Sequence, residues 1–401
     1  MKALWYDMDI GKAIALQVGK LFTRNAAFSP LSPFHYGDIP EPAIPNPRWL
    51  KVKNIRCGLC ASDIHLIFMD ISPKVFPAAV PGGSRTYLGH ELVGEIVELG
   101  SEVEGFALGD RIAQRIEYPS CSQMEISPPC RQCAEGNYAI CENAGLLPLA
   151  SEHPGAGFSP FMVMHRSQPF RIPAALTDDQ AALLEPTSCA VHEVLRRPPR
   201  AGDKVLVVGS GALGLLTLAA VRALQPEAQV YVSVRYPFQA ERAERMGAQG
   251  VFLGRQATYS GAERVCGARL LSAPFGNRIV LGGFDVVFDT VGSEASLQDS
   301  LRWARARGAV VVFGVNLKPG AVDYTPVWYQ EVDLIGAYCY GKEASGKNSF
   351  EIAARLLAEK RIPVEGLITH RFPIRDYRAA IRAFLSKGKS KAIKVVLEHT
   401  E

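Results

Sequence analysis

The pattern of apolar and polar positions changes near residue 175. Before it, short apolar runs are broken by Pro and Gly, and stretches such as 49–57 and 92–100 alternate as strands do. The first portion is therefore predicted to be mostly β. After it, short Val-rich runs that are mostly apolar occur at 204–209, 228–234, 284–292, 308–314 and 332–338. Helix-like stretches lie between and beyond these runs, at 212–224, 238–246, 294–306 and 350–360.

Mostly apolar strands that alternate with helices indicate a parallel sheet covered on both faces. The sequence thus predicts an α/β, doubly wound domain over 178–340. From 363 the chain returns to a strand, a helix over 376–387 and a closing strand over 393–397. Because this tail resembles the first portion, we expect it to complete that portion, with the α/β unit inserted.

Composition and charge exclude several classes of protein. Hydrophobic residues make up 48% and charged residues 21% of 401 residues, which is typical of a globular chain and not of disorder or coiled coil. The net charge of +4 gives no reason to expect a nucleic-acid partner. No run of about 18 apolar residues occurs, so we expect no membrane partner. Asp7, Asp9 and Lys12 interrupt any signal-peptide core, and a cytoplasmic protein is expected.

The nine cysteines are unevenly distributed, since six of them lie between Cys57 and Cys141. In a reducing compartment, clustered cysteines indicate metal binding or catalysis more often than disulfides.

A glycine-rich turn follows the strand at 204–209. Gly209, Gly211 and Gly214 form G-x-G-x-x-G before a helix that starts at Ala212 and Leu213. The pattern alone is weak, but a preceding strand and a following helix are the context of a dinucleotide site. Gly209 allows the tight turn, Gly211 lets the backbone approach the pyrophosphate, and Gly214 allows close helix–strand packing. The helix N-terminus then offers N–H groups to the phosphates.

The end of the next strand bears on which dinucleotide binds. An acid about 20 residues after the turn binds the ribose hydroxyls of NAD. Here the chain has Arg235 and Tyr236 and no acid. A guanidinium grips phosphate, so the sequence favours NADP(H) over NAD(H), with Tyr236 flanking the adenine.

Two groups of metal-binding residue types are present. Cys60, His90 and Glu185 are suitable Zn²⁺ ligands, and three protein ligands with an open position define a catalytic zinc site. Cys130, Cys133 and Cys141 are spaced as in a closed structural zinc lobe, placed at about 119–143. Such a site needs a fourth ligand, and Cys121 is the obvious candidate.

In the order and spacing of these motifs, the chain resembles the zinc-containing medium-chain dehydrogenase/reductase family, the alcohol, sorbitol and threonine dehydrogenase group. The segments that carry the resemblance are C-x-x-C-x-S-D-x-H at 57–65, GHE-x-x-G at 89–94, the cysteine lobe, Glu185-Pro186 and the glycine-rich turn. The resemblance implies a GroES-like, mostly-β catalytic domain from 1–177 and 341–401, and a Rossmann cofactor domain over 178–340. It places the active site between them.

Carried over by position, the resemblance implies that Cys60, His90 and Glu185 hold the catalytic zinc. Glu91 is the acid of the GHE segment, which in the family approaches or leaves the metal. Whether Glu91 or Glu185 is a ligand stays open at this point.

Three residues around the ligands also match the family. Ser62 corresponds to the hydroxyl that hydrogen-bonds the alcohol, Asp63 to an acid behind the ligands, and His65 to the end of a proton relay. The implied activity is hydride transfer between NADP(H) or NAD(H) and a small alcohol or carbonyl compound. A secondary alcohol, polyol or sugar is favoured by Glu at the third ligand position.

Two departures from the family pattern matter. The family's first lobe cysteine falls at Ser127, so Cys121 would have to replace it on a longer loop. The segment 66–87 lies between the two ligand motifs and is longer than in short members, so the substrate cannot be carried over.

Two alternatives stay open: a zinc-independent quinone or enone reductase of the same superfamily, and a non-catalytic zinc-binding interaction protein. The family also implies a homo-dimer or homo-tetramer, built partly by sheet edges of the cofactor domain.

Overall fold

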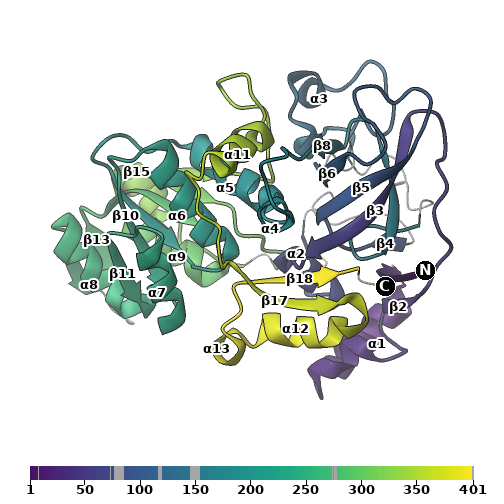
Figure 1. The fold of residues 1–401 in the computed structure, drawn as a ribbon. Helices are drawn as coiled ribbons and strands as arrows, with labels where there is room; N and C mark the ends of the chain where they lie inside the picture. Colours follow the sequence, from purple (N-terminus) through teal and green to yellow (C-terminus); the bar gives the residue numbers. More distant parts are fainter. Residues whose placement is uncertain are drawn as a thin grey trace. The chain divides into compact units, whose positions relative to one another are not determined.

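The computed structural model describes residues 1–401 except 8, 73, 76–84, 116–119, 145–153, 273, 275–277, 319 and 400–401. The described chain forms two compact units (Figure 1). The first comprises Met1–Glu185 and Gly366–Glu401, and the second comprises Pro186–Glu365. The tail thus rejoins the first unit later than residue 341.

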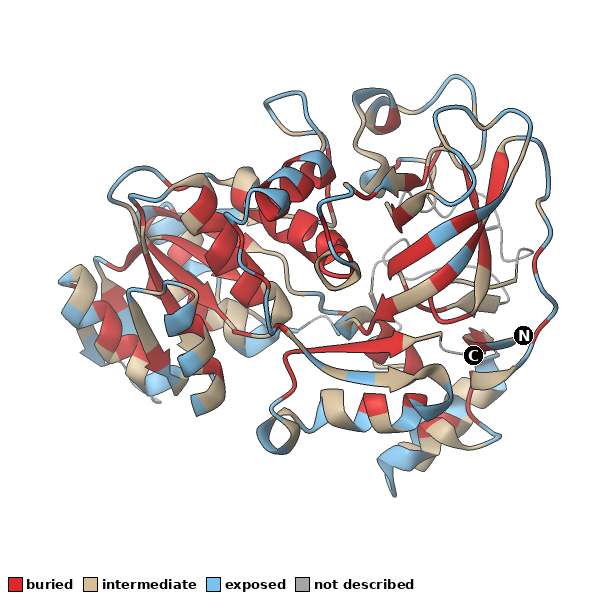
Figure 2. Ribbon diagram, in the orientation of Figure 1, coloured by how far each residue is buried: buried red, intermediate tan, exposed pale blue. Residues whose placement is uncertain are grey.

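The second unit is built on a six-stranded parallel sheet. Its strand order is β11 (Gly250–Leu253), β10 (Gln229–Val234), β9 (Lys204–Val208), β14 (Phe284–Asp289), β15 (Ala304–Val312) and β16 (Asp333–Gly336). When the strands of this sheet alone are numbered in chain order, their order is 3-2-1-4-5-6, as in dinucleotide-binding folds. The predicted doubly wound sheet is confirmed, and Figure 2 shows its central strands mostly buried, whereas the edge strands β11 and β16 are more exposed.

Helices connect these strands at α6 (Ala212–Leu224), α7 (Pro237–Arg245), α8 (Gly254–Cys266), α9 (Glu294–Trp303) and α10 (Thr325–Tyr329), and α11 (Ser349–Ala358) follows the last strand. A hairpin of β12 (Arg269–Ser272) and β13 (Arg278–Leu281) was not predicted. The helix predicted over 294–306 ends earlier, at Trp303, because the backbone is extended from Ala304, where β15 begins.

The first unit contains a seven-stranded sheet whose pairings are mostly antiparallel. The path is β17 (Ile368–Pro373), β18 (Lys394–Glu398), β3 (Trp49–Gly58), β5 (Glu91–Leu99), β6 (Arg111–Gln114) and β8 (Pro169–Arg171), and β7 (Phe161–His165) pairs with β3. A smaller sheet joins β2 (Phe34–Asp38), β1 (Lys2–Asp7) and β4 (Arg85–Tyr87). Short helices accompany them: α2 (Ala61–Ile67), α3 (Arg131–Glu135), α4 (Asp178–Ala181), α12 (Tyr377–Leu385) and α13 (Lys387–Ser390). The mostly-β first portion and the return of the tail to it are as predicted.

Of the helices of the first unit, the sequence predicted the one over 376–387 and not the others, the longest of which is the first helix of the chain. α1 (Ile10–Lys20) begins where the Asp9 side chain accepts a hydrogen bond from the Lys12 backbone N–H. Its apolar residues are spaced as in a helix, but Leu16 is its one buried residue. Among the described residues, none of the helices combines the length and apolarity needed to cross a bilayer.

Candidate active site

Three neighbouring strands bring the first group of predicted ligands together. β3 ends at Gly58, two residues before Cys60, and β5 begins at Glu91, one residue after His90. Gly58 pairs with Glu91 in the antiparallel register, so both ligand segments lie at the same edge of the sheet. β18 pairs with β3 on its other side, and its first residue, Lys394, lies at that edge too.

The side chains at this edge form a donor group for a cation. The Cys60 sulfur, a His90 ring nitrogen and a Glu91 carboxylate oxygen all lie within 4.8 Å of one another. Asp63 accepts hydrogen bonds from the Cys60 N–H (2.9 Å) and the Gly89 N–H (3.4 Å), and its carboxylate lies 3.7 Å from His90 Nδ1. Asp63 therefore positions both ligand segments, and its contact with Nδ1 leaves Nε2 of His90 for a metal.

Burial and charge compete at His90. Burial alone would lower the pKa of His90, but the nearby Asp63, Cys60 and Glu185 raise it well above its ordinary value. The side chain is thus surrounded by groups that favour a positive charge. A zinc ion would satisfy the same surroundings by displacing the proton, because imidazole binds metal in its neutral form.

Lys394 is a site residue that the sequence did not predict. Its ammonium forms a buried ion pair with Glu91 and donates to the Leu59 carbonyl at 3.3 Å. Gly58 makes room for this pair, since a Cβ there would collide with the Glu91 carboxylate and the Lys394 chain. The available signal was a single charge in the otherwise apolar closing strand over 393–397.

Glu185 lies near this group without belonging to it. It is buried at the start of α5 (Leu184–Arg196), and its charge raises the pKa of His90, but it is not among the donors within 4.8 Å of one another. Of the two acids left open by the sequence, the structure brings Glu91 to Cys60 and His90.

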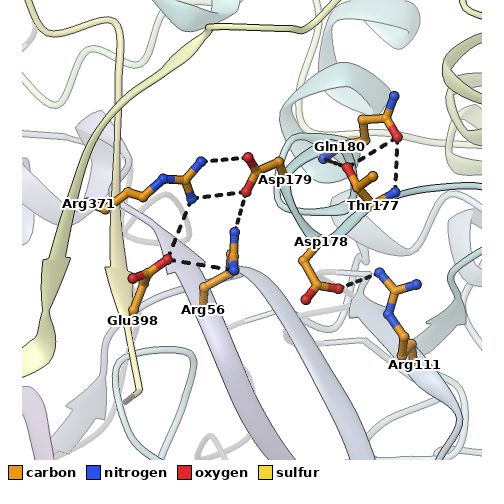
Figure 3. A network of polar contacts seen from close by, with 8 residues as sticks. All are labelled: Arg56, Arg111, Thr177, Asp178, Asp179, Gln180, Arg371 and Glu398. Carbon is orange, nitrogen blue, oxygen red and sulfur yellow. Dashed lines mark hydrogen bonds and ion pairs between the residues drawn. The ribbon is translucent and has the colours of Figure 1, made fainter.

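The chain leading to Glu185 is held by a polar network (Figure 3). Asp179 on α4 accepts hydrogen bonds from Arg56 on β3 and from Arg371 on β17, and Glu398 on β18 contacts both arginines. Arg111 on β6 pairs with Asp178 at 2.5 Å. α4 is therefore attached to the strands that carry the donor group.

Ser62, Asp63 and His65 lie on α2, which begins directly after Cys60. Ser62 and His65 are three residues apart, so they share one face of the helix. Asp63 is buried and points back to the Cys60 N–H, so its role differs from theirs.

The four lobe cysteines form a second donor group, which includes Cys121. Their sulfurs lie within 4.8 Å of one another, with 3.7 Å between Cys121 and Cys141 and 3.9 Å between Cys130 and Cys141. Four sulfurs at about 2.3 Å from a zinc ion have tetrahedral edges of about 3.8 Å. The donor set and its spacing therefore fit a structural zinc.

Backbone geometry stabilises the thiolate form of one of these ligands. Cys130 caps α3, and its sulfur accepts from the N–H groups of Cys133 and Glu142, each at 3.4 Å. Burial opposes ionisation, yet these hydrogen bonds lower the pKa of Cys130 to about 6. All four cysteines are free of disulfides.

The glycine-rich turn of the second unit has the geometry that a dinucleotide needs. Gly209 has a φ of +94°, which favours glycine, and Gly211 precedes the N-terminus of α6 at Ala212 and Leu213. A Cβ at Gly214 would collide with the Gly209 carbonyl, so helix and strand pack closely there. The first turn of α6 therefore presents its N–H groups beside a turn in which Gly209 and Gly211 have no side chains.

Arg235 lies at the same edge of the parallel sheet as this turn. Ser233 of β10 pairs with Val208 of β9, and the Ser233 carbonyl accepts from the Gly209 N–H at 3.0 Å. The exposed guanidinium of Arg235 stacks on Tyr236 at 5.5 Å from the ring centroid. Within the described part of the chain, no carboxylate forms a salt bridge with Arg235.

Comparison with protein families gives two matches. Residues 46–174 match the family described as alcohol dehydrogenase GroES-like domain, and residues 212–359 match zinc-binding dehydrogenase. Together they cover more than two thirds of the chain and confirm the predicted combination of a GroES-like and a Rossmann-type domain.

Individual relatives agree with these matches. L-threonine 3-dehydrogenase of Paraburkholderia xenovorans (strain LB400) is 27% identical over 85% of this chain and 90% of the relative. A zinc-binding dehydrogenase of Sinorhizobium meliloti 1021, solved bound to NADP, is 28% identical, with a TM-score of 0.69 over 91% of this chain and 95% of that one. Galactitol-1-phosphate dehydrogenase of Escherichia coli is 21% identical, with a TM-score of 0.72 over 99% and 100% of the chains, and shows the shared fold.

The sulfur geometry predicts that Cys121 is needed to fill the lobe. We expect Cys121→Ser to lower the zinc content by about one ion per chain, because a tetrahedral site would lose one of four thiolates. Elemental analysis of dialysed protein measures this. Cys266→Ser, outside both donor groups, is the matched control. Equal zinc content in Cys121→Ser and wild type would contradict the assignment.

Proposed function

Because this chain belongs to the zinc-containing medium-chain dehydrogenase/reductase family, we propose that Cys60, His90 and Glu91 or Glu185 hold its catalytic zinc. The protein is an alcohol dehydrogenase-like oxidoreductase that uses zinc and a nicotinamide cofactor. The observation that carries the proposal is the group of thiol, imidazole and carboxylate donors at the β3–β5 edge. One thiolate, one imidazole and one carboxylate make a donor set that zinc enzymes use.

When bound, zinc supplies a Lewis acid at the substrate oxygen, and the nicotinamide accepts or donates the hydride. The chain's own residues prepare the site for this chemistry. Asp63 fixes His90 through Nδ1 and fixes the Cys60 segment through its N–H. Lys394 forms an ion pair with Glu91, which compensates the charge of that carboxylate in a buried position.

Proton movement is assigned to α2. Ser62 Oγ accepts the proton of the alcohol hydroxyl and passes it to His65, which releases it to solvent. The proton leaves the substrate oxygen as the hydride leaves the adjacent carbon, so an alcohol becomes a carbonyl compound. Reduction follows the same path in reverse.

We further propose that NADP(H) is preferred over NAD(H). Arg235 is exposed beside the glycine-rich turn and has a charge that suits a 2′-phosphate. Among the similar solved dehydrogenases, one contains NADP and another NADH, so the proposed preference rests on Arg235.

The substrate class proposed is a secondary alcohol, polyol or sugar. The threonine and galactitol-1-phosphate dehydrogenases among the relatives both act on secondary or polyol alcohols by name. Part of the 66–87 segment, namely 73 and 76–84, lies outside the described residues, so its contribution to specificity stays a prediction.

The assembly proposed is a homo-dimer or homo-tetramer in the cytoplasm. β16 is an edge strand of the parallel sheet, and Leu334 on it is 48% exposed. Trp328 and Tyr329 of α10 are exposed as well. Two copies of β16 could pair and bury this apolar edge. Free thiols in both donor groups suit a reducing compartment.

Replacing the zinc thiolate tests the proposed chemistry. We expect Cys60→Ala to lower kcat/KM by about a thousandfold or more, because electrostatic stabilisation at the reacting oxygen would be lost. Oxidation of a panel of alcohols, polyols and sugars is followed at the reduced-nicotinamide absorbance, with cofactor binding measured separately. The control is Cys57→Ala, a buried cysteine outside the donor group. Turnover that survives metal removal would instead support a zinc-independent reductase.

The cofactor preference depends on Arg235. We expect Arg235→Ala to lower kcat/KM for NADP⁺ about tenfold or more, because a charge-assisted contact to phosphate would be lost, and to leave NAD⁺ nearly unchanged. Steady-state kinetics with both cofactors measures this, and Arg245→Ala on α7 is the control. A wild-type enzyme that prefers NAD⁺ tenfold would overturn the proposal.

The assembly depends on the β16 edge. We expect Leu334→Asp to shift the mass measured by light scattering toward the monomer, because paired copies would bury two carboxylates. Leu253→Asp, at the opposite edge strand β11, should leave the mass unchanged. A monomeric wild type, or the reverse sensitivity of the two variants, would refute this interface.

A further inference from the structure

α1 has its apolar residues on the side that faces solvent. Five large side chains, which we call the α1 apolar face, are between 52% and 84% exposed: Ile10, Ile14, Val18, Leu21 and Phe22. With about 3.6 residues per turn, these positions form one continuous stripe along the helix and its last turn.

The polar side chains of α1 are turned toward the protein instead. Lys20 donates to the Phe68 carbonyl at 2.7 Å and pairs with Asp70 at 2.8 Å. Gln17 donates to the Met69 carbonyl at 2.7 Å, and Lys12 lies 3.3 Å from His35 Nε2. This is the reverse of a normal surface helix, whose apolar stripe faces the core. The helix is thus held in place by these polar contacts and by buried Leu16, while its apolar face stays exposed.

A row of arginines lies on and just before α12, which packs against the segment that follows α1. Arg375, Arg378 and Arg382 follow one another at helical spacing along α12 and its preceding turn, and all are exposed. We call them the arginine stripe. Within the described part of the chain, none of the three forms a salt bridge. All three line a hollow in the surface, and Asp376 is the one carboxylate among the residues that line it.

Contacts connect the two features into one surface. η1 (Arg24–Phe28) follows α1 and packs on α12, where Phe28 meets Tyr377 edge-on at 6.2 Å. Arg378 donates to the Phe28 carbonyl at 3.3 Å. Between them is a hollow of about 280 Å³ lined by Asn25, Phe28, Ser29, Arg378 and Arg382. Figure 1 shows α1 and α12 as neighbours in the first unit.

We propose that the α1 apolar face and the arginine stripe together dock on an anionic lipid bilayer. An exposed aliphatic and aromatic helix face inserts at the level of the headgroups, and arginines beside it bind headgroup phosphates and carboxylates. The expectation of no membrane partner rests on the lack of a spanning helix, whereas peripheral docking needs only one apolar face. A second copy of the chain is the less suitable occupant, because a two-fold contact here would bring two arginine stripes toward each other.

Vesicle co-sedimentation of the full-length protein tests the proposal. With phosphatidylcholine vesicles we expect little binding, and with vesicles that also contain phosphatidylserine we expect strong binding. Binding should fall when NaCl rises from about 0.1 M to about 0.5 M, since screening shortens the reach of the arginine charges. Equal binding to both vesicle types, or none to either, would overturn the proposal.

Two sets of variants separate the two parts of the surface. Ile14→Ser with Leu21→Ser, and Arg375→Ala with Arg382→Ala, should each reduce the bound fraction about tenfold or more. Leu108→Ser and Lys53→Ala, also exposed and in the first unit, are the controls and should bind as wild type does. Turnover of each variant reports that the fold is intact. If wild type does not bind vesicles, and the serine variant has a lower mass than wild type in light scattering, a second copy is the occupant and the lipid proposal fails.

Discussion

The first unit depends on the balance of charge at the sheet edge where β3, β5 and β18 meet. Asp63 and Glu91 are both buried there, and an unpaired buried carboxylate costs several kcal/mol. Glu91 is compensated by Lys394, and Asp63 by two backbone N–H groups and His90. Burial still raises the pKa of Asp63, so these partners offset the cost only in part. A divalent cation held by Cys60 and His90 would add positive charge where two carboxylates need it, which links metal binding to the stability of this edge.

Much of the two donor groups could be predicted because residue type and spacing limit the choices. Cys60 and His90 could be predicted because each belongs to a recognisable motif, at 57–65 and 89–94. Cys121 could be predicted because it was the obvious cysteine to complete the lobe. What the sequence could not give was the register that places Gly58 opposite Glu91. That register decides which acid comes to Cys60 and His90. The pairing of β18 with β3 also brings in Lys394, more than 300 residues away in the chain, for which no local motif exists.

The fold, too, was predictable in some elements and not in others. The parallel strands were predictable because a strand that is buried on both faces is rich in apolar residues on both of them, as in β9 and β14. β11 and α8 were missed because β11 is short and α8 carries only a weak apolar stripe. α1 was missed for a different reason. Most of its large apolar side chains face solvent and Leu16 alone is buried, so apolar periodicity and burial do not coincide in this helix.

The tail over 366–401 connects the two surfaces on which the proposals rest. Its last strand supplies buried Lys394 to the donor group, and its helix α12 supplies the arginine stripe to the outer surface. α12 is fixed in rotation because Tyr377, Ala380 and Ile381 pack into the core, which keeps Arg375, Arg378 and Arg382 on the opposite face. The α1 apolar face is fixed as firmly by the hydrogen bonds of Gln17 and Lys20. Both parts of the docking surface are therefore preorganised, so contact with a bilayer would require little loss of conformational entropy.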